Sequence, residues 1–421
     1  MRINGNNNKS LLRFTTAGSV DDGKSTLIGR LLFDSKSIFE DQMDHIVESS
    51  RRLGKEDVDL SLLTDGLRAE REQGITIDVA YRYFATPRRK FIIADTPGHI
   101  QYTRNMVTGA STADVAVILV DARSGPTEQT LRHAYIASLL DIRHIIFCIN
   151  KMDLVDYSEI AFMKFKARLS EISGKLGVEN SYYVPISAKW GDNVVDRSVN
   201  MNWYDGKTFL DLIETIEIAK NYDSSDARFP VQTVIRPLSH EFHDYRGYAG
   251  RIAGGRFRIG DEILVLPSNL KSRIRGINCR GKDRVEATAG DSVSFTIEDQ
   301  ISISRGDLIV KPESLPESDS SIELMVCWFN EKPLTAGSRY LVRNHTSETN
   351  SVVLSVNYKV DINTLETDIS DLTVRMNDIS NVTLKTSGPL FFDSYRKNHI
   401  TGSIVFIDEG TNETAGAGMI V

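Results

Sequence analysis

The stretch Gly18-Ser19-Val20-Asp21-Asp22-Gly23-Lys24-Ser25 matches the phosphate-loop pattern G-x-x-x-x-G-K-[ST]. An apolar run at 11–17 precedes it and has the composition of a buried strand, and a run at 26–33 with helical spacing follows it. The motif requires this context, because glycines let backbone N–H groups turn toward phosphates at the positive end of a helix. Lys24 is predicted to reach the β- and γ-phosphates, and the Ser25 hydroxyl is predicted to bind Mg²⁺. The stretch therefore predicts a nucleoside triphosphate site.

Three further motifs are expected to contact the base or the γ-phosphate of the nucleotide. They are Asp95-Thr96-Pro97-Gly98-His99, Asn150-Lys151-Met152-Asp153 and Ser187-Ala188-Lys189. Each follows an apolar run typical of a strand, at 91–94, 144–149 and 182–186. Because ligands of an open α/β sheet bind at the carboxyl ends of its strands, the four motifs are expected to meet at one edge.

The motif Asn150-Lys151-Met152-Asp153 indicates guanine. The Asp153 carboxylate can accept hydrogen bonds from the ring N–H and the 2-amino group of guanine, whereas adenine would leave it unpaired. The backbone of residues 187–189 is expected to contact the guanine carbonyl, and Asp95 is expected to hold Mg²⁺ through a water. The predicted GTP-binding residues are Gly18, Ser19, Val20, Asp21, Asp22, Gly23, Lys24, Ser25, Thr26, Asp95, Thr96, Pro97, Gly98, His99, Asn150, Lys151, Met152, Asp153, Ser187, Ala188 and Lys189.

This order of motifs resembles the translation-factor GTPases, and more narrowly the GTPase subunits of bacterial sulfate adenylyltransferases. The narrower resemblance rests on the phosphate loop with its Asp21-Asp22 pair, on residues 101–114 and on the ending at 411–420. Residues 71–77 resemble the first switch segment of the class. Ile100 and the pair Pro126-Thr127 depart from the commonest pattern, and neither departure is expected to touch a phosphate or base contact.

The resemblance implies further roles. His99 would orient the attacking water, Thr76 would bind Mg²⁺ beside Ser25, and Lys24 would supply charge at the γ-phosphate. The other histidines, His133 among them, are predicted to be structural or exposed. Sulfate and ATP would react on a partner, a smaller PP-loop ATP-binding catalytic subunit, because this sequence has one phosphate loop and neither an H-x-G-H nor an S-G-G-x-D-S motif. GTP hydrolysis here would drive formation of adenosine 5′-phosphosulfate and diphosphate there.

Two other functions share the same GTP motifs. One is a translation elongation factor that delivers tRNA, and the other is a regulatory GTPase that assists assembly. The Asp21-Asp22 pair and the Gly416-Ala417-Gly418-Met419 ending favour the sulfate-activating family over the first of these. Only the sulfate-activating function predicts a stable PP-loop partner.

Composition is ordinary for a globular protein, with 41% hydrophobic and 25% charged residues in 421. The net charge of −7 argues weakly against a nucleic-acid partner. No apolar run is long enough for a membrane span, and residues 1–10 lack the apolar core of a signal peptide, so a cytoplasmic location is expected.

The hydrophobic pattern predicts three domains after a flexible tail at 1–10. Residues 11–226 alternate strands and helices, which is typical of a mostly parallel sheet with helices on both faces. From 229 the pattern changes to short strands punctuated by glycines, which predicts two small β-barrels at 229–311 and 320–421, joined by a linker at 312–319. Residues 256–266 are predicted as two strands joined by a Gly-Asp turn, and 37–53 as a helix leading toward the switch.

Overall fold

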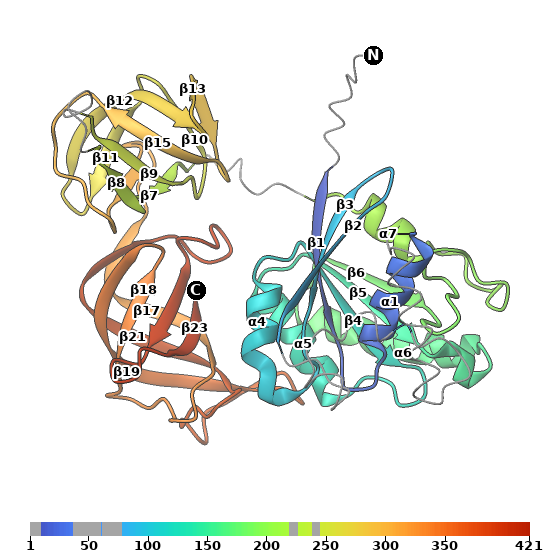
Figure 1. Cartoon of the computed structure of the whole chain (residues 1–421). Helices are drawn as coiled ribbons and strands as arrows, with labels where there is room; N and C mark the ends of the chain where they lie inside the picture. The colour runs from blue at the N-terminus through green and yellow to red at the C-terminus, as the bar shows by residue number, and fades with distance from the viewer. Residues whose placement is uncertain (1–9, 37–59, 61–77, 219–225, 238–244) are drawn as a thin grey trace, which may run out of the picture. The chain divides into compact units, whose positions relative to one another are not determined.

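The computed structural model describes residues 10–36, 60, 78–218, 226–237 and 245–421 (Figure 1). The chain forms two compact units, one built on residues up to Ile218 and one on Ala219–Val360 together with Thr367–Val421. The predicted helix at 37–53 and the predicted switch segment at 71–77 lie outside the described residues, as does nearly all of the predicted tail. Among the described residues, no helix combines the length and apolar character needed to cross a membrane.

The first unit is built on a six-stranded sheet, as the apolar runs predict. Its strands, in spatial order, are β2 (Ala80–Ala85), β3 (Lys90–Asp95), β1 (Leu11–Ala17), β4 (Val115–Asp121), β5 (His144–Asn150) and β6 (Asn180–Pro185). All neighbouring pairs are parallel except β2 with β3. Strand β1 is therefore central, and its carboxyl end leads into the phosphate loop between β3 and β4.

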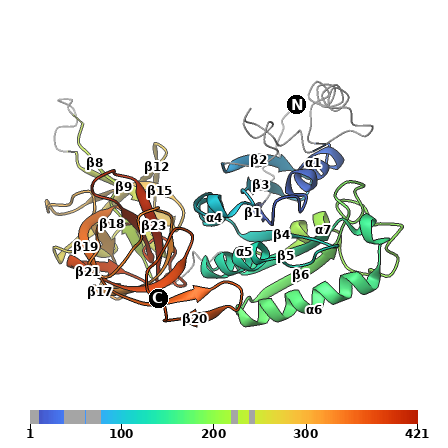
Figure 2. The ribbon, with the colours of Figure 1, turned by 90° about the horizontal axis from the view of Figure 1, so that it is seen from below.

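Helices cover both faces of this sheet (Figure 2). Val115, Val117 and Leu119 of β4 belong to one apolar cluster with residues of α1 and α7. The alternate residues of a strand point to the opposite face, where α5 packs on β4. The helical segments are α1 (Lys24–Asp34), η2 (Ile100–Tyr102), α4 (Thr103–Ala110), α5 (Glu128–Leu139), η3 (Met152–Val155), α6 (Glu159–Lys175) and α7 (Phe209–Thr215).

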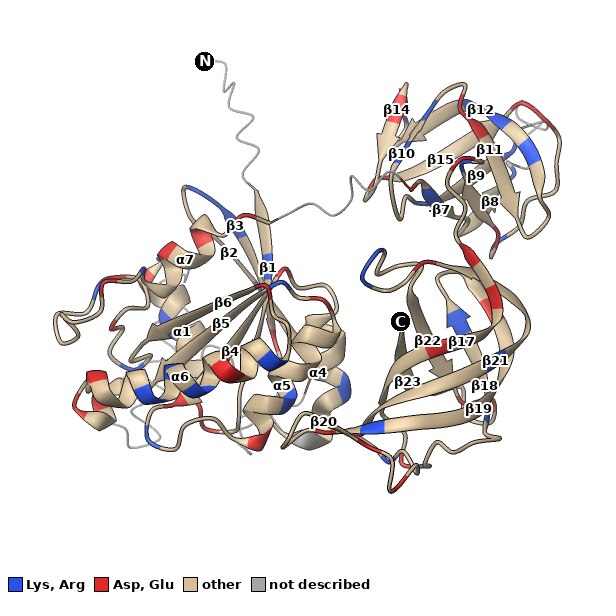
Figure 3. Cartoon of the chain, turned by 180° about the vertical axis from the view of Figure 1, so that it is seen from behind, with Lys and Arg blue, Asp and Glu red and all other residues tan. Residues whose placement is uncertain are grey.

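Helix α6 shows how these helices are amphipathic. Phe162, Phe165 and Leu169 are buried at spacings of three and four residues. Its other face carries charges of both signs (Figure 3), including Lys175, whose Nζ lies 3.1 Å from Glu171 Oε1. This is the pattern of a helix with one face on a sheet and one in solvent.

The second unit begins with an antiparallel barrel that packs around Phe229, Phe257 and Phe295, whose ring centroids lie 4.3 to 6.4 Å apart. Its strands are β7 (Arg228–Pro230), β8 (Thr233–Ile235), β9 (Gly247–Arg251), β10 (Arg256–Arg258), β11 (Glu262–Leu266), β12 (Leu270–Cys279), β13 (Lys282–Arg284), β14 (Glu286–Thr288), β15 (Ser292–Ile297) and β16 (Leu308–Val310).

A second barrel follows, in the order β18-β22-β23-β17-β21-β19, and pairing of β18 with β19 closes it. Trp328, Tyr340 and Phe406 fill its centre with edge-to-face contacts. The strands are β17 (Glu317–Trp328), β18 (Arg339–Asn344), β19 (Ser347–Asp361), β20 (Glu366–Asp368), β21 (Ile379–Phe392), β22 (Ser403–Ile407) and β23 (Thr414–Ile420). The predicted fold class, a phosphate-loop domain followed by two barrels, is confirmed.

Two details differ from the sequence-based expectation. The strands predicted within 256–266 exist, but β10 pairs with β14 in a separate two-stranded sheet, and β11 pairs with β12 and β16. Strand β17 begins at Glu317, inside the segment predicted as a linker, because its first residues pair with the end of β21. The domain ranges 11–226, 229–311 and 320–421 remain predictions.

Candidate functional site

The phosphate loop connects the carboxyl end of β1 to α1. Gly18 and Gly23 have φ angles of 146° and 93°, which a residue with a Cβ rarely adopts. Gly98 of the second motif lies against this loop, and a Cβ there would overlap Lys24 Nζ and the Gly18 carbonyl oxygen. The loop and the D-x-x-G motif are therefore in direct contact, and glycine is required at both sides of that contact.

Lys24 is the cation at the centre of the loop. Its side chain is buried, and its Nζ donates to the carbonyl oxygens of Gly18 at 2.9 Å and Ser19 at 2.8 Å. Burial lowers the pKa of Lys24, while the carboxylates of Asp95, Asp22 and Asp21 act in the opposite direction. A cation held by main-chain carbonyls inside a loop of N–H groups is suited to bind phosphate.

Asp95 ends β3 directly beside the loop. It is paired in register with Thr16 of β1, and the Thr16 hydroxyl donates to Asp95 Oδ1 at 2.9 Å. The Thr96 hydroxyl donates to the Thr16 carbonyl at 2.5 Å. The Thr16 hydroxyl thus fixes the Asp95 carboxylate at the carboxyl end of the sheet, and the Thr96 hydroxyl ties the ends of β1 and β3 together.

Asn150 joins three of the predicted motifs. Its Nδ2 donates to the Asp22 carbonyl at 2.7 Å, and its Oδ1 accepts from the Ala188 backbone N–H at 2.9 Å. The Ser187 hydroxyl donates to Asp153 Oδ1 at 2.6 Å. The structure therefore brings the phosphate loop, the N-K-x-D motif and the S-A-K motif together, as their strand ends predict.

The remaining predicted residues lie in the same segments, apart from Thr76, which is outside the described residues. His99 follows Gly98 and precedes η2, where its ring lies edge-on to Tyr102 at 6.2 Å. The others are Val20 and Asp21 on the exposed part of the loop, Ser25 and Thr26 in the first turn of α1, Pro97 after β3, buried Met152 in η3, Lys151 directly before η3, and Lys189 at the end of the S-A-K motif.

Three sets of contacts with the site come from residues that the sequence did not assign to it, and Thr127 and His133 make the first set. Pro126-Thr127 was expected to touch no phosphate or base contact, and the structure places the Thr127 hydroxyl 2.7 Å from Ser19 Oγ of the phosphate loop. His133, predicted to be structural or exposed, is buried on α5, the helix that Thr127 caps, and its Nδ1 accepts from the Gly18 N–H at 3.0 Å. Burial and the nearby Lys24 lower the pKa of His133 to about 3, so the ring is a neutral acceptor.

Arg30 of α1 makes the second unexpected contact. Its Nε donates to the Ala188 carbonyl at 3.3 Å, and its Nη2 donates to the Lys189 carbonyl. The helix that follows the phosphate loop is thereby tied to the S-A-K segment. No sequence motif marks Arg30, since a cation on a helix face usually indicates only a solvated surface.

Asp121 makes the third. It ends β4 with its side chain 7% exposed, and it accepts from Lys151 Nζ at 2.9 Å and from Arg123 Nη2 at 2.7 Å. Burial acts to raise the pKa of Asp121, but the hydrogen bonds from Arg123 and Lys151 outweigh it and hold the pKa well below its usual value. Its place at the carboxyl end of an apolar run was a usable signal, because the predicted motifs occupy the same place on neighbouring strands.

We predict that Asp121 acts on nucleotide binding through Lys151. Asp121→Asn is expected to weaken GDP binding about 10-fold, the effect of losing one charge-assisted hydrogen bond, and to cost nothing further in a Lys151→Met background. Titration of a fluorescent GDP analogue into the four proteins of this cycle measures the coupling. Glu171→Gln, an exposed change of equal charge on α6, is the control. An undiminished effect of Asp121→Asn in the Lys151→Met background would contradict the prediction.

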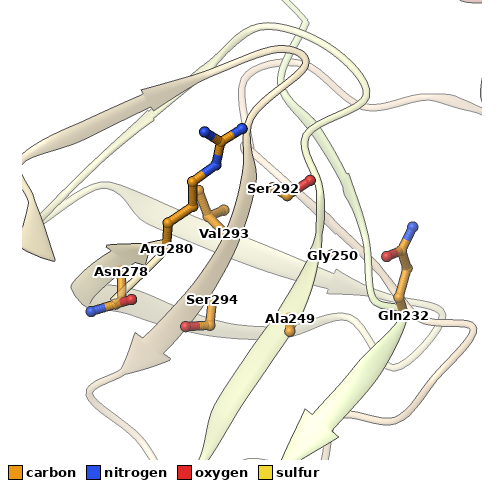
Figure 4. A pocket seen from close by; sticks show the side chains of 8 residues that line it. All are labelled: Gln232, Ala249, Gly250, Asn278, Arg280, Ser292, Val293 and Ser294. Atoms are coloured by element: carbon orange, nitrogen blue, oxygen red, sulfur yellow. The ribbon is translucent and has the colours of Figure 1, made fainter. Parts of the chain in front are cut away.

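A shallow hollow of about 280 Å³ lies elsewhere, in the first barrel (Figure 4). Its lining residues are Gln232, Ala249, Gly250, Asn278, Arg280, Ser292, Val293 and Ser294. None of the residues predicted to bind GTP lines it.

Comparison with known proteins agrees with this geometry. The family model of the elongation factor Tu GTP binding domain matches residues 9–221, and that of the GTP-eEF1A C-terminal domain-like family matches 321–421. The sulfate adenylyltransferase subunit 1 of Sulfurovum sp. (strain NBC37-1) is 50% identical over 98% of this chain and 88% of its own length. The chain belongs to the sulfate adenylyltransferase subunit 1 family. 

Other members of this family are similarly related. The subunit 1 of Bacteroides fragilis (strain YCH46) is 49% identical, over 98% of this chain and 86% of its own length. The bifunctional enzyme CysN/CysC of Mycobacterium tuberculosis (strain H37Rv) is 48% identical, over 98% of this chain and 67% of its own length. The resemblance stated from the motifs is thus confirmed over almost the whole chain, and the first unit is a GTP-binding domain of the elongation factor Tu type.

Proposed function

We propose that this chain is the GTP-hydrolysing subunit of a heteromeric sulfate adenylyltransferase. GTP hydrolysis in its first unit drives the formation of adenosine 5′-phosphosulfate and diphosphate from ATP and sulfate on a partner subunit. The observation that carries the proposal is the meeting of four GTP motifs at one sheet edge, in a chain of this family. The sulfate–phosphate anhydride is unfavourable to form, so a second energy source is chemically reasonable.

The proposed GTP site uses the residues predicted from the sequence. Lys24 and the loop N–H groups bind the phosphates, and Asp153, aligned by Ser187, reads the guanine ring N–H and 2-amino group. Asn150 fixes both segments and so sets the distance between the phosphate and base subsites.

Mg²⁺ is the proposed cofactor, and the donor set fits it. Ser25 offers a hydroxyl at the start of α1, and Asp95 offers a carboxylate fixed by Thr16. Mg²⁺ prefers such oxygen donors and commonly combines few protein ligands with waters and substrate phosphates. When bound, the ion neutralises charge on the phosphates. Thr76 is proposed as a further ligand on the basis of the family resemblance.

His99 is proposed to orient the attacking water. Because Gly98 lies against Lys24 and Gly18, the backbone of His99, the next residue, starts close to the phosphate loop. The Gln101 backbone N–H donates to His99 Nδ1 at 3.4 Å. Nε2 is therefore the ring nitrogen that we propose faces the water. Positioning of this kind is the main contribution that a GTPase makes to phosphoryl transfer.

The partner is proposed to be the smaller PP-loop ATP-binding subunit. The relatives are named subunit 1, which implies a second subunit for those proteins. The extent of energy coupling is limited by how differently the partner binds the GTP and GDP states of this chain.

A diphosphate-release assay tests the proposal. The purified chain, the candidate PP-loop subunit and their mixture are each given ATP and sulfate, with and without GTP. Diphosphate release that needs both proteins and rises with GTP is expected. Formation of adenosine 5′-phosphosulfate by this chain alone, or a mixture indifferent to GTP, would overturn the proposal. Binding of aminoacyl-tRNA would instead support a tRNA-delivering factor.

Asp153→Asn tests the base assignment separately. The amide presents a donor to the guanine ring N–H, so GTP affinity is expected to fall by about 100-fold or more, while xanthosine triphosphate, which carries an oxygen at position 2, gains affinity. Competition of the two triphosphates against a fluorescent GDP analogue measures the switch. A variant that still prefers GTP would show that Asp153 does not read the base.

A further inference from the structure

The carboxylate of Asp22 is buried inside the phosphate loop. Asp22 is 5% exposed, and its Oδ2 accepts from the Ser19 backbone N–H at 2.6 Å. Its own carbonyl accepts from Asn150 Nδ2 at 2.7 Å. A Cβ placed on Gly18 would lie 3.2 Å from the Asp22 carboxylate. The charge is therefore fixed in position within the turn of chain proposed to enclose the phosphates.

This carboxylate faces several charged groups. Burial raises the pKa of Asp22, while the Ser19 N–H and the cations of Lys24 and Lys151 favour its ionised form, and Asp121 opposes it. The interaction with Lys24 is mutual, since Asp22 also acts on the Lys24 ammonium. Asp22 thus neutralises part of the positive field that would attract a polyphosphate.

The size of the effect follows from Coulomb's law. Two like charges roughly 7 to 10 Å apart, at an effective dielectric constant of about 20, change a binding constant by about one to two orders of magnitude. A neutral oxygen acceptor of the same size can also accept from the Ser19 N–H, in a weaker hydrogen bond but without this cost. The charge itself therefore calls for a function.

We infer that Asp22 is an affinity-setting residue, whose carboxylate weakens the binding of guanosine phosphates by charge repulsion and speeds the release of GDP. This inference rests on the phosphate-loop assignment proposed above. Faster release of GDP would let one subunit complete repeated cycles of GTP hydrolysis.

The competing explanation is that Asp22 only shapes the loop through its hydrogen bond to Ser19. The two explanations predict opposite signs for Asp22→Asn. This substitution keeps an oxygen acceptor of the same size and removes the charge. It tightens binding if the charge repels phosphate, and it weakens binding or leaves it unchanged if only the shape matters.

The experiment measures GTP, GDP, GMP and guanosine binding to the full chain by displacement of a fluorescent GDP analogue. Asp22→Asn is expected to bind GTP about 10-fold tighter or more, with a smaller gain for GDP, a still smaller one for GMP and none for guanosine. The release rate of GDP is expected to fall by the same factor as its dissociation constant. Unchanged or weaker GTP binding, or an equal shift for guanosine, would overturn the inference.

Three further arms keep the result interpretable. Asp21→Asn makes the same charge change at an exposed position of the loop, and a smaller effect is expected there because water screens it. The release rate is measured on loaded molecules, so any unfolded fraction of Asp22→Asn does not contribute. Lys24→Ala serves as the reference: if it binds GTP like the wild type, the phosphate-loop assignment itself fails, whatever Asp22→Asn does.

Discussion

Lys24→Ala is expected to weaken GTP binding by at least about 100-fold and to abolish GTP-stimulated diphosphate release. Lys24 is the cation that the structure places inside the phosphate loop, held at the carbonyls of Gly18 and Ser19. Its removal takes away a proposed phosphate ligand and a cation that acts on the carboxylates of Asp22 and Asp95 at the same place. Binding of a fluorescent GTP analogue and the two-protein diphosphate assay measure the two effects.

The control for this change is Lys90→Ala. Lys90 is exposed at the amino end of β3, whereas the site lies at the carboxyl end of that strand. Because the Lys24 hydrogen bonds are confined to the loop, circular dichroism of Lys24→Ala is expected to match that of the wild type. GTP stimulation at the wild-type level in Lys24→Ala would refute the assignment of the phosphate loop.

Arg228→Met is expected to destabilise the second unit by roughly 3–5 kcal/mol, the usual cost of removing one partner of a buried ion pair. Arg228, at the start of β7, and Asp393, just after β21, are 0% and 2% exposed. Their Nε–Oδ2 and Nη2–Oδ1 distances are both 2.9 Å, so the pair is bidentate. Arg228 Nη1 also donates to the Ser314 carbonyl at 2.6 Å, and the Thr401 hydroxyl donates to Asp393 at 2.7 Å. The buried Arg228–Asp393 pair thus joins the two barrels, and the half-exposed Lys397 lies beside it, with its Nζ 3.5 Å from Asp393 Oδ1.

The double variant Arg228→Met with Asp393→Leu is expected to recover much of this loss, because no unpaired charge remains buried. Denaturant unfolding can be followed through Trp328, which is buried in the second barrel, after Trp190 and Trp203 are replaced by phenylalanine. These are the three tryptophans of the chain. An Arg228→Met protein with an unchanged midpoint would show that the pair adds no net stability.

The same pair predicts a pH dependence. Burial would raise the pKa of Asp393, but the hydrogen bonds and charge of Arg228 outweigh it and lower the pKa below the usual 3.8. A carboxyl with a lowered folded-state pKa stabilises the fold above its unfolded-state pKa. This contribution is therefore expected at neutral pH and is lost as the pH falls below about 4. Unfolding midpoints of wild type and the double variant should converge in that acidic range.

Much of the site was readable from the sequence because its motifs are local. Glycines at positive φ, an apolar strand before each motif and a helix after the first are properties of short segments. The rule that parallel strands present their carboxyl ends at one edge then predicts the meeting of Gly18, Asp95, Asn150 and Ser187. The seven-residue run of buried residues in β4 also marked a strand covered on both faces.

Pairing between distant segments was decided by the tertiary structure. Strand β10 was expected to adjoin β11 because a Gly-Asp turn lies between them, yet it pairs with β14, since a turn sequence fixes the local bend and leaves the partner open. His133 lies 115 residues from Gly18, and Arg228 lies 165 residues from Asp393. In the sequence alone, each of these residues stands in an ordinary helical or strand pattern, and nothing nearby in the sequence indicates its distant partner.

The amino-acid sequence by itself determined the GTP motifs, the family and the order of one α/β domain and two barrels, because hydrophobic period and loop chemistry are written within a few consecutive residues. Only the tertiary structure decided which groups support those motifs. Asp121 contacts Lys151, Thr127 and His133 contact the phosphate loop, and the buried Asp22 carboxylate accepts from the Ser19 N–H of the same loop. Such contacts depend on strand order and register, which arise when all the segments pack together.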